Sequence, residues 1–173
     1  KLWIDGELNV GQIKQVKIED LLDRAPIELE NLDINRELSA KVVFITGAAG
    51  SIGSEIARQV GACKTKTLVL IDQAESPLYD LQQEFIHSKT ANFVAEIADV
   101  TDQRRMQQLF ELYKPQIIFH AAAYKHVPLM EDNPYEAIKV NVCGTKCLAD
   151  LSVNFKVDKF VMVSTDKAVN PTN

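Results

Sequence analysis

The stretch that decides the fold is KVVFITGAAGSIG, residues 41–53. It begins with Lys41–Thr46, a continuous apolar run rich in β-branched residues, which is typical of a strand covered on both faces in a parallel sheet. Gly47, Gly50 and Gly53 follow in the pattern G-x-x-G-x-x-G, and a helical pattern begins among them. A strand, a glycine-rich turn and a helix in this order predict the first unit of a doubly wound α/β fold.

The same alternation continues along the chain. Four further apolar runs have the length of strands: Thr67–Asp72, Asn92–Ile97, Gln116–His120 and Lys159–Ser164. Amphipathic stretches separate them: Ser51–Ala62, Glu75–Lys89, Asp102–Tyr113 and Glu131–Asn154. Strands and helices joined by short loops in this way close as right-handed βαβ units. The sequence therefore predicts a doubly wound, Rossmann-like parallel sheet.

Composition narrows the classes of function. The chain has 173 residues with 19 Lys and Arg against 24 Asp and Glu, a net charge of −5. This acidic balance, without a basic block, argues against a nucleic-acid partner. No apolar run approaches the roughly 20 residues of a membrane helix, and no signal peptide opens the chain, so we expect a cytoplasmic location. The three cysteines and three histidines lack metal-ligand spacing, and we expect no metal site.

Residues 1–40 differ in character from the rest of the chain. Scattered apolar positions lie among acidic and turn-forming residues, which predicts a linker or docking segment. We expect a short helix near Glu19–Arg24, ended by Pro26, and a helical turn at Asn35–Ser39. Residues 41–173 form the predicted nucleotide-binding domain.

The glycine-rich turn predicts a phosphate site. Phosphate oxygens approach backbone N–H groups at a helix N-terminus, where side chains would block them and the helix dipole favours an anion. Gly47 and Gly50 allow the turn and this approach, and Gly53 allows the helix to pack against the strand. Ser51 and Ile52 complete the predicted cofactor-binding residues of the turn. The alternative is a tight strand–helix turn without a ligand.

Asp72 lies at the end of the second strand, 19 residues beyond Gly53. A carboxylate at this position accepts hydrogen bonds from a ribose 2′-OH and repels the 2′-phosphate of NADP, which favours NAD over NADP. The alternative is an ordinary strand-end or helix-cap aspartate. Asp99 and Val100, after the third strand, occupy the position expected to hold the adenine ring.

Small residues end the fourth strand. Ala121, Ala122 and Ala123 let the backbone pass close to a flat ligand, and we include them in the cofactor site. Lys125 and His126 follow in a loop at the carboxyl edge of the sheet and are the predicted substrate-binding residues. Lys125 is suited to face a diphosphate, and a solvated surface lysine is the alternative.

The next predicted helix contains a polar residue and a glycine in apolar surroundings. We include Asn141 among the cofactor-binding residues. An interior glycine costs a helix about 1 kcal/mol relative to alanine, so close packing is the expected reason for Gly144.

The fifth strand is followed by Thr165, Asp166 and Lys167. A hydroxyl, a carboxyl and an amine side by side at the carboxyl edge of the sheet form a possible acid–base set, and we predict them as catalytic residues. The alternative is an ordinary polar turn.

These segments resemble the extended short-chain dehydrogenase/reductases. The resemblance rests on ITGAAGSIGSEIARQV, LVLIDQAESPLYDL, HAAAYKHVPLMEDNP, NVCGT and VSTDKAVNPTN, and it covers Lys41–Asn173. More narrowly, they are similar to the CapD-like UDP-N-acetylglucosamine 4,6-dehydratases of bacterial capsule and glycan biosynthesis. The earlier stretch KIEDLLDR resembles the part that connects a membrane-associated N-terminal half to the catalytic domain in large members, which implies a membrane-anchored parent protein.

The resemblance implies a redox-neutral reaction on a UDP-sugar with NAD as cofactor. The sugar is oxidised at C4, water is lost across C5–C6, and the hydride returns to C6. By motif, Thr165 holds the C4 hydroxyl, Asp166 protonates the leaving C6 hydroxyl and Lys167 takes the C5 proton.

Two other functions stay open at this point. One is a nucleotide-sugar 4-epimerase, which shares C4 oxidation but transfers no C5 proton. The other is a non-catalytic NAD-binding sensor module. The family resemblance also implies a homo-oligomer. Because the family's later catalytic residues, last strands and sugar-nucleotide domain would follow Asn173, we expect this chain by itself to be an inactive fragment.

Overall fold

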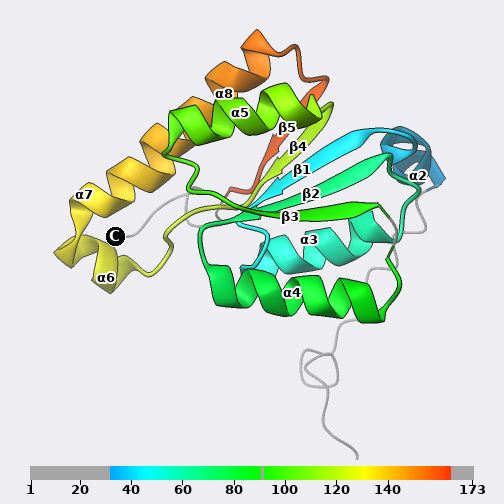
Figure 1. Ribbon diagram of the computed structural model, residues 1–173. Coiled ribbons are helices and arrows are strands. Elements are labelled where there is room, and N and C mark those ends of the chain that lie inside the picture. Colours follow the sequence, from blue (N-terminus) through cyan, green and yellow to red (C-terminus); the bar gives the residue numbers. More distant parts are fainter. Residues whose placement is uncertain (1–31, 91, 165–173) are drawn as a thin grey trace, which may run out of the picture. The chain divides into compact units, whose positions relative to one another are not determined.

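The computed structural model describes residues 32–90 and 92–164. The short helix expected near Glu19–Arg24 and the predicted catalytic residues Thr165, Asp166 and Lys167 lie outside these described residues. The described part is a five-stranded sheet with helices on both faces (Figure 1). The prediction of a doubly wound parallel α/β sheet is therefore confirmed.

All paired strands of the sheet run parallel, in the order β3-β2-β1-β4-β5. The strands are β1 (Val42–Thr46), β2 (Thr67–Asp72), β3 (Phe93–Ile97), β4 (Ile117–His120) and β5 (Lys159–Met162). From β1 the chain winds outward to β2 and β3, then returns to add β4 and β5 on the other side. The strand order therefore reverses between β1 and β4, and in such sheets the crevice at the carboxyl ends of the strands binds ligands.

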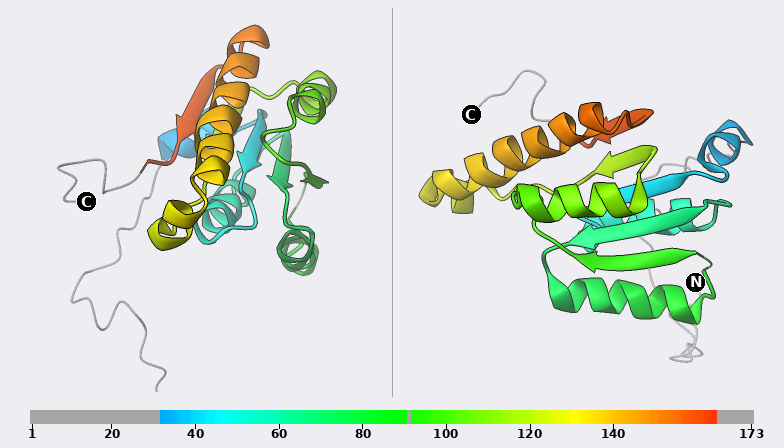
Figure 2. Two further views of the ribbon diagram at one scale, coloured as in Figure 1. Left: turned by 90° about the vertical axis from the view of Figure 1, so that its left-hand side faces the viewer. Right: turned by 45° about the horizontal axis from the view of Figure 1, so that its top comes forward.

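Helices cover both faces of the sheet (Figures 1 and 2). They are α2 (Leu32–Leu38), α3 (Ser51–Gly61), α4 (Glu75–His87), α5 (Gln103–Tyr113), α6 (Val127–Asp132), α7 (Pro134–Ala137), η2 (Ile138–Gly144) and α8 (Thr145–Asn154). α3 and α4 pack on one face, and α5, η2 and α8 pack on the other. Helices α6 and α7 lie beyond the carboxyl ends of the strands (Figures 1 and 2). Segment η2 is a π-helix.

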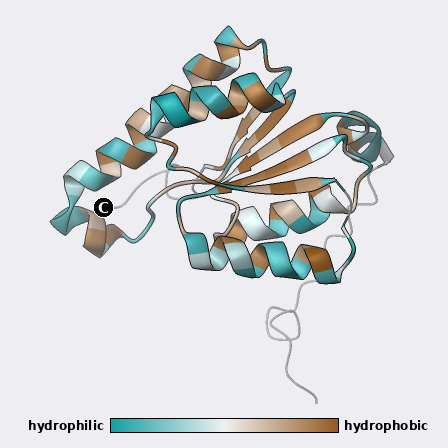
Figure 3. Cartoon of the chain, in the orientation of Figure 1, coloured by the Kyte–Doolittle hydropathy of each residue, from teal (hydrophilic) through white to brown (hydrophobic). Residues whose placement is uncertain are grey.

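Alternation along the strands divides the core between these two faces. On β1, Phe44 faces α5 and α8, whereas Val43 and Ile45 face α3 and α4. All three side chains are fully buried. Because both faces are covered, the central strands are mostly apolar, as Figure 3 shows, and their polar residues lie at the strand ends.

The helical turn expected at Asn35–Ser39 is the helix α2, which begins earlier and ends at Leu38. Leu38 is buried and belongs to the core cluster shared with α3 and α4. The compact unit of the described chain therefore begins at Leu32.

The helix predicted over Glu131–Asn154 is confirmed from Pro134 onward, since α7, η2 and α8 follow one another without a break to Asn154. Its predicted start is wrong. Helical structure already begins at Val127, and it is interrupted at Asn133, whose φ of −132° and ψ of 56° are not helical. The cause is Pro134, which has no N–H and whose ring disfavours helical angles in the residue before it. The fifth strand also ends at Met162, two residues before its predicted end.

Close packing at Gly144 is confirmed. A Cβ atom added there would lie 2.8 Å from Cγ2 of Val100, which follows β3. Gly144 therefore lets the helical layer approach the carboxyl end of the sheet.

A buried polar link joins β1, β4 and α8. His120 is 3% exposed, with Nδ1 2.7 Å from the Thr46 hydroxyl and Nε2 2.8 Å from the Thr145 hydroxyl. A neutral imidazole donates through one nitrogen and accepts through the other, so one threonine donates to the ring and the other accepts from it. Burial lowers the pKa of His120 from 6.5 to about 4.

This link makes the stability of the domain depend on pH. When unfolded, His120 takes up a proton below about pH 6.5, whereas the folded ring stays neutral down to about pH 4. The free energy of unfolding should therefore fall by up to about 3 kcal/mol between these pH values. Urea unfolding from pH 7 to pH 4 measures this loss, and His120→Asn should remove it. Parallel pH profiles for the two proteins would contradict the prediction.

Candidate functional site

A cleft opens at the carboxyl ends of β1, β2 and β4, where the strand order reverses. It contains most of the predicted cofactor residues together with several others. Its lining consists of Gly47, Gly50, Ile71, Asp72, Gln73, Ala98, Asp99, Val100, Ala121, Ala122, Ala123, Tyr124 and Val140. The wall is therefore largely backbone and small side chains, with polar groups at the ends of β2 and β3.

The glycine turn has its shape for steric reasons. Gly47 has a φ of +69°, and a Cβ atom there would lie 2.6 Å from the backbone nitrogen of Ala122. A Cβ atom on Gly53 would lie only 1.9 Å from the Gly47 carbonyl oxygen. The first glycine is thus needed for the backbone conformation and the approach to β4, and the third for the packing of α3 on the turn.

The first turn of α3 presents backbone donors. Gly50 is its N-cap residue and has no side chain to bond the N–H groups that follow. Ser51 and Ile52 are exposed on this turn, whereas Gly53 is buried. Uncapped N–H groups beside a side-chain-free turn fit the diphosphate of a dinucleotide.

The Asp72 carboxylate is held by two backbone groups. Oδ2 accepts a hydrogen bond from Ala49 N–H, and Oδ1 accepts one from Ala74 N–H, each at 2.9 Å. It therefore connects the glycine turn to the start of α4, whose N-cap residue is Ala74. Each carboxylate oxygen has a second lone pair, so both can still accept bonds from ribose hydroxyls.

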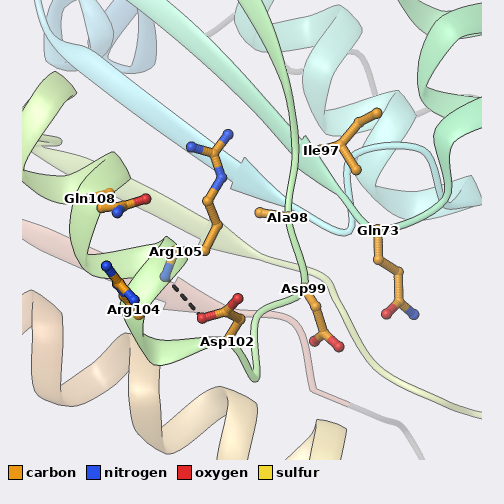
Figure 4. A pocket seen from close by; sticks show the side chains of 8 residues that line it. All are labelled: Gln73, Ile97, Ala98, Asp99, Asp102, Arg104, Arg105 and Gln108. Carbon is orange, nitrogen blue, oxygen red and sulfur yellow. Dashed lines mark hydrogen bonds between the residues drawn. The ribbon is translucent and has the colours of Figure 1, made fainter.

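A neighbouring hollow extends the cleft toward α5 (Figure 4). It is lined by Gln73, Ile97, Ala98, Asp99, Asp102, Arg104, Arg105 and Gln108. Asp99 Oδ1 accepts a bond from Thr101 N–H at 2.8 Å, and Asp102 caps α5 by accepting from Arg105 N–H at 3.0 Å. Figure 4 shows Asp99 and Gln73 extending in the same direction from the ends of neighbouring strands.

Charged side chains fix the α5 side of this hollow. The guanidinium of Arg105 lies 2.7 Å from the Glu96 carboxylate, which also accepts a bond from the Tyr113 hydroxyl. Burial and this carboxylate raise the pKa of Tyr113 to about 12. The Arg105 charge is therefore paired within the fold.

Asn141 lies beside the loop that follows β4. Its Oδ1 accepts from Tyr124 N–H at 2.8 Å, and its Nδ2 donates to the Tyr124 carbonyl at 2.9 Å. The side-chain amide thus bonds both backbone groups of one loop residue. Asn141 does not line the cleft but supports the loop that does.

The predicted substrate residues are exposed at the end of this loop. Lys125 and His126 line neither hollow, and the His126 carbonyl accepts from Met130 N–H at the start of α6. Two polar residues that line the cleft were not predicted, Gln73 and Tyr124. Each directly follows a predicted residue, and that adjacency was the only signal in the sequence.

Within residues 32–90 and 92–164, no group of His, Cys, Asp and Glu side chains could hold a metal ion. No helix in these same ranges is long and apolar enough to cross a membrane.

Fold and cleft together define a Rossmann-like domain of the short-chain dehydrogenase/reductase class. The chain belongs to the family described as polysaccharide biosynthesis protein, which matches residues 43–173. It is 47% identical over 172 residues to the capsular polysaccharide biosynthesis protein CapD of Staphylococcus aureus, covering 98% of this chain and 29% of CapD. The CapD-like resemblance is confirmed.

More distant relatives include nucleotide-sugar 4,6-dehydratases and 4-epimerases. A UDP-N-acetylglucosamine 4,6-dehydratase (inverting) of Campylobacter jejuni is 32% identical, covering 78% of this chain and 39% of that protein. This chain thus spans between a quarter and two fifths of these relatives' length.

Solved structures share the fold. Pen from Bacillus thuringiensis matches with a TM-score of 0.72 and 33% identity, over 79% of this chain and 40% of that one. The UDP-glucose 4-epimerase of Thermus thermophilus in complex with NAD matches with a TM-score of 0.61 and 25% identity, over 72% and 37%. The chain therefore has nucleotide-sugar dehydratases and epimerases as its relatives.

The packing at Gly53 can be tested by substitution. Gly53→Ala would drive a methyl group into the Gly47 carbonyl, so the turn or the helix must move, at a cost of about 3 kcal/mol or more in unfolding free energy. Urea unfolding measures this loss. Gly61→Ala on the same helix is the control, since its Cβ would meet only side-chain atoms at 3.2 Å or more, and it should change stability by less than about 1 kcal/mol. Equal losses in both variants would contradict the account.

Proposed function

We propose that this chain is the NAD-binding part of a nucleotide-sugar 4,6-dehydratase that acts on UDP-N-acetylglucosamine in the synthesis of a bacterial capsule or glycan. The observation that supports this most is the cleft itself. Its glycine turn carries no side chains at Gly47 and Gly50, the Asp72 carboxylate is fixed by backbone N–H groups, and alanines form the wall after β4. Similarity to CapD and to an inverting dehydratase supports the substrate class.

The residues of the cleft fit NAD. The diphosphate would lie over Gly47 and Gly50, which line the cleft, against the N–H groups of Ser51 and Ile52, because these groups at the start of α3 have no side-chain cap. Bound there, NAD would supply the site that takes up the hydride from C4 and returns it to C6.

The adenosine half would lie toward β2 and β3. Asp72 would accept bonds from the ribose hydroxyls, and Asp99 with Val100 would hold the adenine ring. Since its two backbone donors hold the Asp72 carboxylate in place, its charge would oppose a 2′-phosphate, which favours NAD over NADP.

The chemical step falls to residues that follow β5. Thr165 would hold the C4 hydroxyl, Asp166 would give a proton to the departing C6 hydroxyl, and Lys167 would take the proton from C5. A lysine acts as a base only when neutral, and a dry cleft disfavours its charged form.

A 4-epimerase is the second candidate, because an epimerase is among the solved structures with this fold. The two reactions share oxidation at C4 and differ at C5. The adjacent Asp166 and Lys167 favour elimination, since epimerisation at C4 requires no proton transfer at C5. A homo-oligomer, a cytoplasmic location and a membrane anchor stay predictions of the sequence and the resemblance.

The proposal predicts deuterium at C5 of the product. The full-length protein is given UDP-N-acetylglucosamine and NAD in deuterated water, and NMR follows the sugar. We expect a 4-keto-6-deoxy product that carries deuterium at C5. Formation of UDP-N-acetylgalactosamine without C5 exchange would instead identify the epimerase.

Substitution of Lys167 tests whether this residue removes the C5 proton. Lys167→Ala should lower kcat by about 10²- to 10⁴-fold while NAD binding is kept. The matched control is Lys66→Ala, at the exposed amino end of β2, which should leave turnover unchanged. Unchanged turnover in Lys167→Ala would contradict catalysis by this residue. A wild-type protein that binds NAD but turns over no UDP-sugar would instead favour the non-catalytic sensor module.

A further inference from the structure

One side-chain hydrogen bond crosses the cleft. The Gln73 amide Nε2 donates to the Tyr124 hydroxyl at 3.3 Å. Gln73 follows β2 and Tyr124 lies in the loop after β4, while β1 runs between these strands. The bond therefore passes over the carboxyl end of β1, where the glycine turn begins, and both residues line the cleft beside Gly47 and Gly50.

Both ends of this bond are attached to fixed backbone. Gln73 lies between Asp72 and Ala74, which are joined by the carboxylate bond to Ala74 N–H. The backbone N–H and carbonyl of Tyr124 are both held by the Asn141 side chain from η2. The two side chains are therefore presented toward one another by anchored residues.

The bond itself is weak. Tyr124 is 38% exposed, and a neutral hydrogen bond near water contributes only about 0.5–1.5 kcal/mol. Since the anchors stay in place when the side chains part, this contact can open without disturbing the fold.

We propose that Gln73 and Tyr124 form a strap over the bound dinucleotide that slows its release. The inference rests on the proposed function, because it requires a dinucleotide along the glycine turn. The strap parts when the cofactor enters and closes over the section between adenosine and nicotinamide. In a redox-neutral reaction the cofactor ends each turnover in its starting state, so slow release does not limit the rate.

The test is the release rate of NADH from the full-length protein. NADH is bound, an excess of NAD is mixed in, and the loss of NADH fluorescence is followed. Tyr124→Phe keeps the ring and removes the hydroxyl, and Gln73→Leu keeps the size and removes the donor. Each should release NADH about 2- to 10-fold faster. The double variant should be no faster than the singles, since both remove one bond.

Tyr79→Phe is the matched control. Tyr79 lies on α4, is 55% exposed and lines neither hollow, so the same chemical change there should leave release unaltered. If Tyr124→Phe and Gln73→Leu both release NADH at the wild-type rate, the strap is overturned, whereas the proposal of a cofactor site in the cleft is unaffected. Multiplied effects in the double variant would also overturn it, because the residues would then act separately. Failure of the wild-type protein to bind NADH would overturn the cofactor site and the strap together.

Discussion

The contact between α3 and the Gly47 carbonyl is the constraint on which the rest of the site depends. With 1.9 Å between that oxygen and a hypothetical Cβ on Gly53, only a glycine lets the helix start so close to the strand. Because the N-cap residue is Gly50, the first N–H groups of α3 have no side-chain cap at the reversal of strand order. The backbone thereby produces an anion-binding surface before any charged side chain takes part.

Polar side chains then fix the surrounding loops by bonding to backbone. Asp72 joins the glycine turn to α4, and Asn141 holds the loop after β4. His120 connects two strands and α8 beneath them. The three strand ends that form the cleft are thus tied to one another, with Asp72 joining β2 to the glycine turn after β1 and His120 joining β4 to β1. This suits a site that must keep its shape while a long ligand enters and leaves.

Local sequence patterns predicted the sheet well because each buried strand is a separate apolar run. Gly53 and Asp72 could be assigned to the cofactor site because they lie at fixed spacings from the first two of these runs. The break at Asn133 was missed although Pro134 signals it, because the apolar periodicity continues through it. The pairing of Gln73 with Tyr124, and of Asn141 with the Tyr124 backbone, could not be predicted, since these contacts join segments that only the strand order brings together. The roles of Thr165, Asp166 and Lys167 stay predictions.

The most direct test of the central claim is a crystal structure of the full-length protein grown with NAD. The account predicts diphosphate oxygens at about 2.7–3.2 Å from the N–H groups of Ser51 and Ile52, with the adenosine ribose on the Asp72 carboxylate. A dinucleotide bound away from the glycine turn, or a ribose out of reach of Asp72, would contradict it.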